Sequence, residues 1–317
     1  MRPGGLVTVG ETMGLLSSPH VGLLRTAGSL TLGIGGAESN VAIGVARLGG
    51  RATWIGRVGD DPIGDLVVSR LAGEGVDTSL VVRDDGAPTS LMLKEQRTPD
   101  LSRVVYYRQH GPGSRLRPED LDEERIATAQ VLHVTGITPA LSESAARTVT
   151  RAIDMARDAD VTVSLDINYR AALWSPEEAR PVLLELVKTA DIVFAGDDEA
   201  ALLGVHGDPP DQAAALAELG PSRVVIKLGA RGAVACLDGH AVEVAAHQVS
   251  AVDPVGAGDA FVAGFLAEGM AGASGEEALR VGAACGAFVV QVPGDWEGLP
   301  TRAELTHLTA ASGTVLR

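Results

Sequence analysis

The 317-residue sequence predicts an α/β fold built on a mainly parallel central sheet. Three observations lead to this fold class. Short apolar runs alternate with segments of helical spacing through most of the chain. The run 161–167 is apolar almost throughout, as expected for a strand buried on both faces of a parallel sheet. Two glycine-rich turns, at 33–36 and 256–258, stand directly before helical segments.

Composition and charge limit the classes of partner. A hydrophobic content of 45% is enough for a large core, and an aromatic content of 3% means that Ala, Val and Leu must build it. The formal net charge of -15 argues against nucleic acid and against an anionic membrane surface as partners. Any anionic substrate must therefore meet a local group of Arg or Lys. Because residues 1–317 contain no repeat or low-complexity linker, we expect one domain.

The cysteines and the start of the chain bear on location. Cys236 and Cys285 lie in apolar surroundings without metal-ligand spacing, so we expect buried thiols. The first ten residues hold too short an apolar run for a signal peptide, and no stretch approaches a membrane span. These observations predict a soluble cytoplasmic protein.

The first half of the chain begins with a predicted strand and continues into a glycine-broken region. The helix after the first glycine turn should carry apolar residues from Val41 to Leu48, and a second helix should start at Pro62 and end before Gly75. Isolated strands are expected around 13–34, and a pair is expected at 91–94 and 104–108, joined by a polar loop over 96–102. The remaining strands of this half are predicted at 6–10, 53–57 and 80–82.

The second half alternates strands and helices. Ser142 should cap a helix that runs to about Asp158, and Ser175 with Glu178 forms a capping box around Pro176. A hairpin turn is expected at 238–239, between strands 234–237 and 241–244. The other strands are predicted at 131–134, 161–167, 192–194 and 224–228, and the last helices at 259–270 and 276–290.

The stretch from Val252 to Phe261 carries the strongest chemical signal. Gly256 and Gly258 allow close approach of the backbone to a ligand, at a helix start whose amides and dipole attract an anion. Asp259 would repel a phosphoryl group there unless it accepts a proton beside the group being transferred. The alternative is that Asp259 is only an N-cap, and this motif alone does not separate the two interpretations.

Two further sets of polar residues are candidates for substrate contact. Asp166, Asn168 and Arg170 alternate as they leave the carboxyl end of a buried strand, where open α/β sheets bind ligands. Arg170 could bind a carboxylate or the transferring phosphate, or it could simply pair with Asp166. Tyr106 and Arg108 share one face of a strand and could meet a small anion. The alternative for Arg108 is a solvated side chain on an edge strand.

Two signatures resemble those of the ribokinase-like (PfkB) sugar kinases. Asp253 to Phe265 is similar to the C-terminal signature, and Gly35 to Gly64 is similar to the N-terminal one. The resemblance implies a ribokinase-like three-layer αβα sandwich with a small β-sheet lid, formed from about 13–34 and 89–110, that covers the sugar and often mediates dimerisation. It also implies ATP and Mg2+ as cofactors, and it leaves a monovalent cation possible.

The resemblance also implies roles for individual residues. Asp259 would be the catalytic base, and the amides of Gly256, Ala257 and Gly258 the anion hole. Contacts to the sugar would come from Gly35, Gly36 and Asn40. The nucleotide would lie against the Lys-x-Gly-x-x-Gly loop and the end of a strand, at Lys227, Gly229, Gly232, Asn168, Gly256 and Gly258.

The strings Tyr106-Tyr107-Arg108 and Asp166-x-Asn168-x-Arg170-x-x-Leu173-Trp174 are similar to those of 2-keto-3-deoxygluconate kinases. This subgroup implies an acid sugar held by Tyr106, Arg108, Arg170 and Asp295. Glu199 would organise Mg2+ through water. Two positions depart from the pattern: Gly196 replaces an Asn, and Met92 stands where an aromatic residue is usual.

We therefore expect an ATP-dependent kinase that converts 2-keto-3-deoxygluconate to its 6-phosphate, and a homo-oligomer that dimerises through its lid. Fructokinase, or another sugar or nucleoside kinase of this family, is the alternative. A non-catalytic sugar or nucleotide sensor on the same fold is an alternative of another class. A dinucleotide enzyme is disfavoured, because no Gly-x-Gly-x-x-Gly follows the first strand.

Overall fold

The computed structural model describes residues 4–98, 101–305 and 308. Its centre is an eight-stranded sheet in which six neighbouring strands are parallel and a C-terminal hairpin adds two antiparallel strands. In spatial order the strands are β14 (His240–Val244), β13 (Ala233–Leu237), β12 (Arg223–Lys227), β11 (Ile192–Gly196), β10 (Thr162–Asp166), β9 (Val131–Thr135), β1 (Leu6–Val9) and β4 (Ala52–Ile55). The predicted parallel sheet and hairpin are confirmed.

Side chains alternate between the two faces of this sheet, and each face is covered by its own helices. Leu6 and Phe194 belong to one core, whereas their neighbours Val7 and Val193 belong to the other. The first core is completed by α1 (Ala37–Arg47), α2 (Pro62–Gly73), α8 (Ala257–Ala271) and α9 (Gly275–Val289). The second is completed by α3 (Glu123–Thr128), α4 (Glu143–Asp158), α5 (Pro176–Thr189), α6 (Asp197–Leu202) and α7 (Pro209–Ala217). This confirms the three-layer αβα sandwich.

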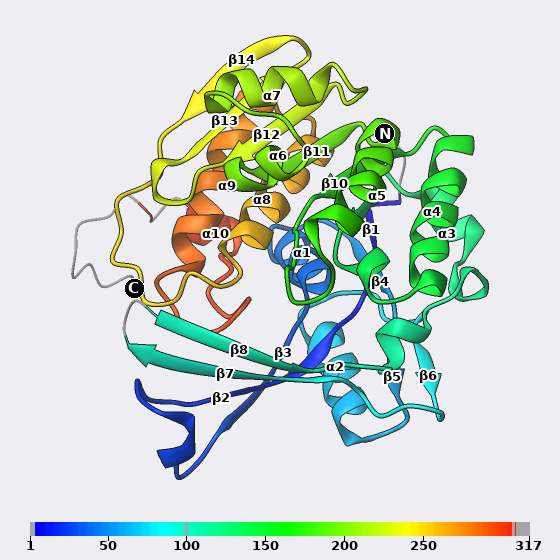
Figure 1. Ribbon diagram of the computed structural model, residues 1–317, viewed down its shortest axis with the longest axis vertical. Coiled ribbons are helices and arrows are strands. Elements are labelled where there is room, and N and C mark those ends of the chain that lie inside the picture. The colour runs from blue at the N-terminus through cyan, green and yellow to red at the C-terminus, as the bar shows by residue number, and fades with distance from the viewer. Residues whose placement is uncertain (1–3, 99–100, 306–307, 309–317) are drawn as a thin grey trace.

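A separate four-stranded sheet forms the lid. Its strands are β3 (Thr31–Gly35), β2 (Met13–Ser17), β7 (Leu91–Thr98) and β8 (Leu101–Tyr107), in that order. Figure 1 shows it extending to one side of the body, with β7 and β8 as its longest strands. The predicted polar loop over 96–102 is wrong, because Gln96 still pairs with Ser102. Their backbone groups complete the ladder, and both side chains are only partly buried, so polar residues are tolerated at this strand end.

Strands near Gly56 differ from prediction. The expected strand 53–57 is split into β4 and β5 (Arg57–Gly59), and the expected strand 80–82 is found at β6 (Val82–Asp84), paired with β5. Gly56 passes so close to Trp54 that a Cβ there would lie 2.2 Å from the indole. Arg57 is buried between Asp84 and Asp120, at 2.8 and 2.9 Å. These ion pairs, which no local sequence pattern predicts, hold the two-stranded sheet of β5 and β6 in place.

Predicted helix starts agree with the structure. The Ser142 hydroxyl accepts the amide of Ala145 at the start of α4, and Ser175 and Glu178 form the capping box of α5. Cys285 is buried, whereas Cys236 is only partly buried, and both are free thiols. Among the described residues, no helix is long and apolar enough to cross a membrane. The last described helix is α10 (Arg302–Leu305).

Candidate active site

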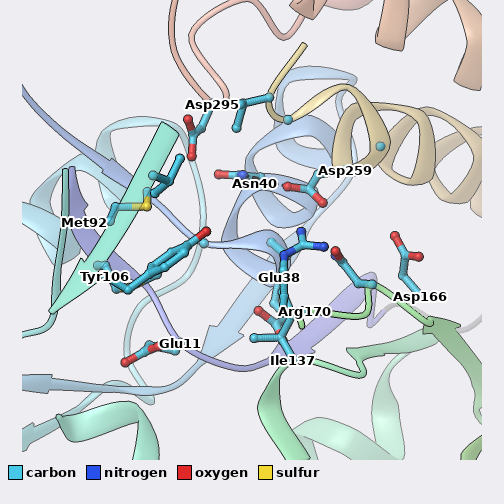
Figure 2. A pocket seen from close by; sticks show the side chains of 18 of the residues that line it. Glu11, Glu38, Asn40, Met92, Tyr106, Ile137, Asp166, Arg170, Asp259 and Asp295 are labelled. Atoms are coloured by element: carbon cyan, nitrogen blue, oxygen red, sulfur yellow. Dashed lines mark hydrogen bonds between the residues drawn. The ribbon is translucent and has the colours of Figure 1, made fainter. Parts of the chain in front are cut away.

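A cavity of about 460 Å3 lies where the parallel strands end, between the body and the inner face of the lid. Its walls come from the turn before α1, the ends of β10, β11 and β12, the turn before α8, and the lid strands. Figure 2 shows Asp259 and Asn40 on one side of this space, with Tyr106 and Met92 across from them. Segments far apart in sequence therefore build one site.

The turn before α8 has the geometry expected of an anion-binding turn. Gly256 has a φ of 80°, and a Cβ there would lie 1.8 Å from the carbonyl oxygen of Asp295, so no side chain fits. Gly256, Gly258 and Asp259 line the cavity. Ala257 does not line it, and its amide donates to the carbonyl of Pro254 at 3.3 Å. The cavity thus meets the first turn of a 15-residue helix.

Asp259 is held by a partner from another helix. Its Oδ2 accepts a 2.8 Å hydrogen bond from Nδ2 of Asn40 in α1. Burial raises the pKa of Asp259 to about 7, and nearby Asp166 adds to the rise, whereas Asn40, Arg170 and Lys227 oppose it. The N-cap interpretation is wrong, since the N-cap is Gly256. A carboxyl group that titrates near neutrality is well matched to proton transfer.

The strand ends carry a charged group beside this carboxylate. The Lys227 ammonium donates to both oxygens of Asp166, at 2.8 and 2.6 Å. Burial lowers the pKa of Lys227, but Asp166 and Glu199 outweigh this effect and raise it. A Cβ on Gly258 would lie 3.4 Å from this ammonium, which places a fixed positive charge next to the glycine turn. Arg170 does not pair with Asp166: it donates to the Tyr169 carbonyl at 3.1 Å.

Glu199 links two loops through hydrogen bonds to their backbone amides. One carboxylate oxygen accepts the amide of Tyr169 and the other accepts the amide of Gly196, both at 2.7 Å. Burial raises the pKa of Glu199. Among the described residues, no group of three or more His, Cys, Asp or Glu side chains is arranged to hold a metal ion by itself. Mg2+ typically takes only one or two carboxylates together with substrate phosphates, so Glu199 and Asp198, which both line the cavity, fit such a partial set.

The far end of the cavity is formed by the lid. Arg108 is not solvated: its side chain is 9% exposed, lies 2.5 Å from Oε2 of Glu11, and stacks 5.5 Å from the ring centre of Tyr106. Glu11 also accepts the hydroxyl of Ser90 at 2.8 Å. Met92 is buried against the same wall. Arg108 therefore faces the cavity with its charge already balanced by Glu11.

The glycines before α1 make room for this end of the site. A Cβ on Gly35 would lie 2.2 Å from Cε of Met92 and 2.6 Å from Oδ2 of Asp295, and one on Gly36 would lie 2.3 Å from the Glu11 carbonyl. Asp295 is buried, and burial raises its pKa despite the ammonium of Lys94. Gly36, Asn40 and Asp295 line the cavity, whereas Gly35, expected to contact the sugar with them, is not among its lining residues.

The predicted nucleotide residues divide into two groups. Asn168, with a φ of 43°, lines the cavity together with Lys227. Gly229 and Gly232 belong to the turn after β12 and are not among the lining residues of the cavity. A Cβ on Gly232 would lie 2.0 Å from the carbonyl oxygen of Val244, so its requirement is local packing.

Sequence reasoning missed several buried charges at the site. Glu38 accepts hydroxyls of Thr135 and Thr138 at 2.8 and 2.7 Å, and burial raises its pKa. Lys94 reaches from the lid to Asp253 and Asp295. For Lys94, strand alternation was the available signal. It stands two residues after Met92, so both side chains lie on the same face of the strand.

A glycine turn at a helix start, a carboxylate that titrates near neutrality and a lidded cavity at the end of a parallel sheet define an enzyme site suited to phosphoryl transfer. The comparisons with known proteins agree. Residues 5–302 match the model of the pfkB family carbohydrate kinases, and the chain belongs to that family. It is a carbohydrate kinase.

Individual relatives are similar over nearly the whole chain. A 2-dehydro-3-deoxygluconokinase of Bacillus subtilis is 38% identical, with 98% of this chain and 96% of the relative covered. A 2-dehydro-3-deoxygalactonokinase of Haloferax volcanii is 37% identical, with 92% of each covered. An E. coli protein assigned as a ribokinase II, solved with ATP and Mg2+, superposes with a TM-score of 0.89 at 25% identity over 96% of this chain and 98% of its own.

Proposed function

We propose that this protein transfers the γ-phosphoryl group of ATP to the 6-hydroxyl of 2-keto-3-deoxygluconate. The observation that carries the proposal is the position of Asp259, fixed by Asn40 at the edge of a cavity that also presents the glycine turn of α8. The names of the full-length relatives supply the substrate class.

The proposed reaction needs one proton acceptor and a set of fixed positive charges. Asp259 accepts the proton of the sugar hydroxyl as its oxygen attacks the γ-phosphorus, and the bond from that phosphorus to the β–γ bridging oxygen breaks, leaving ADP. The amides at the start of α8 stabilise the charge on the transferring oxygens. Lys227, kept protonated by Asp166, adds a positive charge beside them. Magnesium, when bound, would neutralise nucleotide phosphate charge, with Asp198 and Glu199 placed to reach its water shell.

For the acid sugar, we propose that the carboxylate lies at the lid end of the cavity. Arg170 is the main candidate to bind it, because this exposed guanidinium has no carboxylate partner among the described residues. Arg108 and Tyr106 would complete the contact, with Glu11 holding the Arg108 guanidinium in place. At the other end, Oδ1 of Asn40 is buried and has no hydrogen-bond partner in the described structure, so it is available to a sugar hydroxyl.

One assay series tests the proposal. Purified protein with ATP and Mg2+ should phosphorylate 2-keto-3-deoxygluconate faster than its galactose-derived epimer and much faster than fructose. Faster turnover of fructose would favour fructokinase, an outcome consistent with Arg108 being balanced by Glu11. An absence of ATP consumption with every sugar would overturn the kinase proposal and favour a sensor.

We also propose that two copies associate through the outer face of the lid. The strand register aligns one apolar row across all four strands: Leu32, Leu16, Leu93 and Val105. Leu32 and Val105 are 42% and 36% exposed, and Tyr107 beside them is 62% exposed. Exposed apolar rows of this kind mark protein interfaces. Sedimentation should show a dimer for the wild type and a monomer for the double variant Leu32→Glu/Val105→Glu. A monomeric wild type would refute the interface.

The cytoplasm, where ATP is produced, is the proposed location.

A further inference from the structure

The lid contributes one buried positive charge to the body. Lys94 lies on the inner face of β7, and its side chain is 6% exposed. Its ammonium is 2.6 Å from Oδ2 of Asp253, 3.1 Å from Oδ1 of Asp295 and 3.4 Å from the carbonyl oxygen of Gly294. The ammonium donates hydrogen bonds to Asp295 and to the carbonyl of Gly294, and its contact with Asp253 is an ion pair. Both carboxylates are also buried, at 6% and 8% exposure.

The three oxygens belong to two loops that meet at the glycine turn. Asp253 accepts the amide of Val255 through Oδ1 and the amide of Gly294 through Oδ2, each at 3.2 Å. The carbonyl of Asp295 then packs directly on Gly256, at the position a Cβ would need. Lys94 therefore joins the loop that enters α8 to the loop that carries Asp295 into the cavity, where Figure 2 shows that carboxylate near Met92.

The ammonium adds to direct bonds that already join these segments, from the amide of Gly294 to Asp253 and from the amides of Val252 and Asp253 to the carbonyl of Val290. What it supplies is the positive charge between the carboxylates. Two buried carboxylates facing one another repel, and isolated charges are strongly disfavoured away from water. The set of two carboxylates and one carbonyl around a single positive charge is also the oxygen environment that an alkali-metal ion would occupy. In this chain the charge is covalently attached to the lid, and Gln96 on the same strand adds a 3.0 Å hydrogen bond to the carbonyl of Val252.

We propose that Lys94 is a positioning residue for phosphoryl transfer, acting as a built-in monovalent cation that holds the anion-binding turn in place while the lid is docked. This inference rests on the proposed function. The transfer step would then depend on lid contact and would need no free alkali-metal ion. Lys94 does not touch the reacting atoms; it acts through Asp253, Asp295 and the main chain of Gly256.

The first test uses the unaltered enzyme. Replacing K+ and Na+ in the assay with tetramethylammonium should leave kcat unchanged, because the site is already filled. A strong activation by K+ over tetramethylammonium would overturn the proposal.

The second test removes the tethered cation. Lys94→Ala should lower kcat on the order of 100-fold, as expected when a turn that holds the reacting group is misplaced. Ammonium, methylammonium or K+ should restore much of the rate by entering the vacated space, and Lys94→Arg should keep part of it. Arg97→Ala, which removes an exposed charge from the same strand, is the control and should behave as wild type. A loss that no monovalent cation restores would show a merely structural role.

The third measurement does not depend on activity. Hydrogen exchange of the amides in 252–259 should be faster in Lys94→Met than in Arg97→Ala or wild type. Unchanged exchange would overturn the proposal even if the enzyme phosphorylates its sugar. Faster exchange in a protein that phosphorylates no sugar would refute the proposed function and leave the role of Lys94 in holding the loop intact.

Discussion

At one end of the cavity the groups around Asp259 come from main-chain turns and strand ends of the body, whereas at the other end Tyr106, Arg108 and Met92 are side chains on lid strands. The first end includes a glycine turn in which Gly256 has no room for a side chain. The second is a wall of lid side chains. We therefore expect changes at the body end to affect kcat and changes at the lid end to affect sugar selectivity.

The largest expected effect is at Asp259. Asp259→Asn keeps the size and shape of the side chain, and an amide contact to Asn40 replaces the original hydrogen bond. Because the proton acceptor is lost, kcat should fall by about 100- to 10,000-fold. The KM values for sugar and ATP should change little. Steady-state kinetics at saturating ATP measure both quantities, and near-normal turnover would show that another group is the base.

Gly256→Ala tests the backbone requirement at the body end. The new Cβ would clash with a main-chain oxygen at a left-handed φ of 80°, and neither problem can be relieved by a side-chain rotation. We expect a loss of about 1–3 kcal/mol in unfolding free energy together with a loss of most activity. Gly269→Ala, at an open position of the same helix, is the matched control and should be neutral or slightly stabilising. Equal urea midpoints for the two variants would contradict this account.

Arg170→Ala tests the proposed contact to the sugar carboxylate, made by a residue of the loop after β10. Losing a charge-assisted hydrogen bond to a substrate carboxylate should cost about 2 kcal/mol, or roughly thirtyfold in kcat/KM for the acid sugar. Because Arg170 also lowers the pKa of Asp259, the rates are measured well above pH 7, where the carboxylate is deprotonated in both proteins. There the value for fructose, which has no carboxylate, should stay near that of wild type. Arg108→Ala should show the same selectivity with a smaller loss, because Glu11 already balances its charge. Equal losses with both sugars would remove the proposed carboxylate contact.

The pH dependence of the rate tests whether Asp259 is the base. Because the pKa of Asp259 is about 7 and its deprotonated form is the base, kcat/KM should rise with pH up to about 7 and then level off. Asn40→Leu removes a hydrogen bond that lowers this pKa, so its profile should move to higher pH. Arg108→Ala should leave the profile in place. A pH-independent rate between pH 5 and 8 would contradict the assignment of Asp259.

The same carboxyl group gives the smallest expected effect, on stability. Its folded pKa lies above the unfolded value of 3.8, so between these two pH values the folded state binds more protons than the unfolded state. Stability should therefore decrease as pH rises toward 7, and Asp259→Asn should unfold at a higher temperature than wild type at pH 8 but not at pH 4. Thermal melts at both pH values measure this difference.

The sequence by itself determined the features that are read from contiguous residues. Strand and helix order, the caps at Ser142 and Ser175, and the glycine turn before Asp259 all follow from local spacing and backbone preference, and the structure confirms them. Only the tertiary structure decided which charges face one another. Lys227 pairs with Asp166, Arg108 pairs with Glu11, and Lys94 of the lid pairs with Asp253 of the body. Long charged side chains form ion pairs with the opposite charges that the fold brings within reach. Those pairings depend on distances between segments more than 60 residues apart in each case, and no local pattern encodes them.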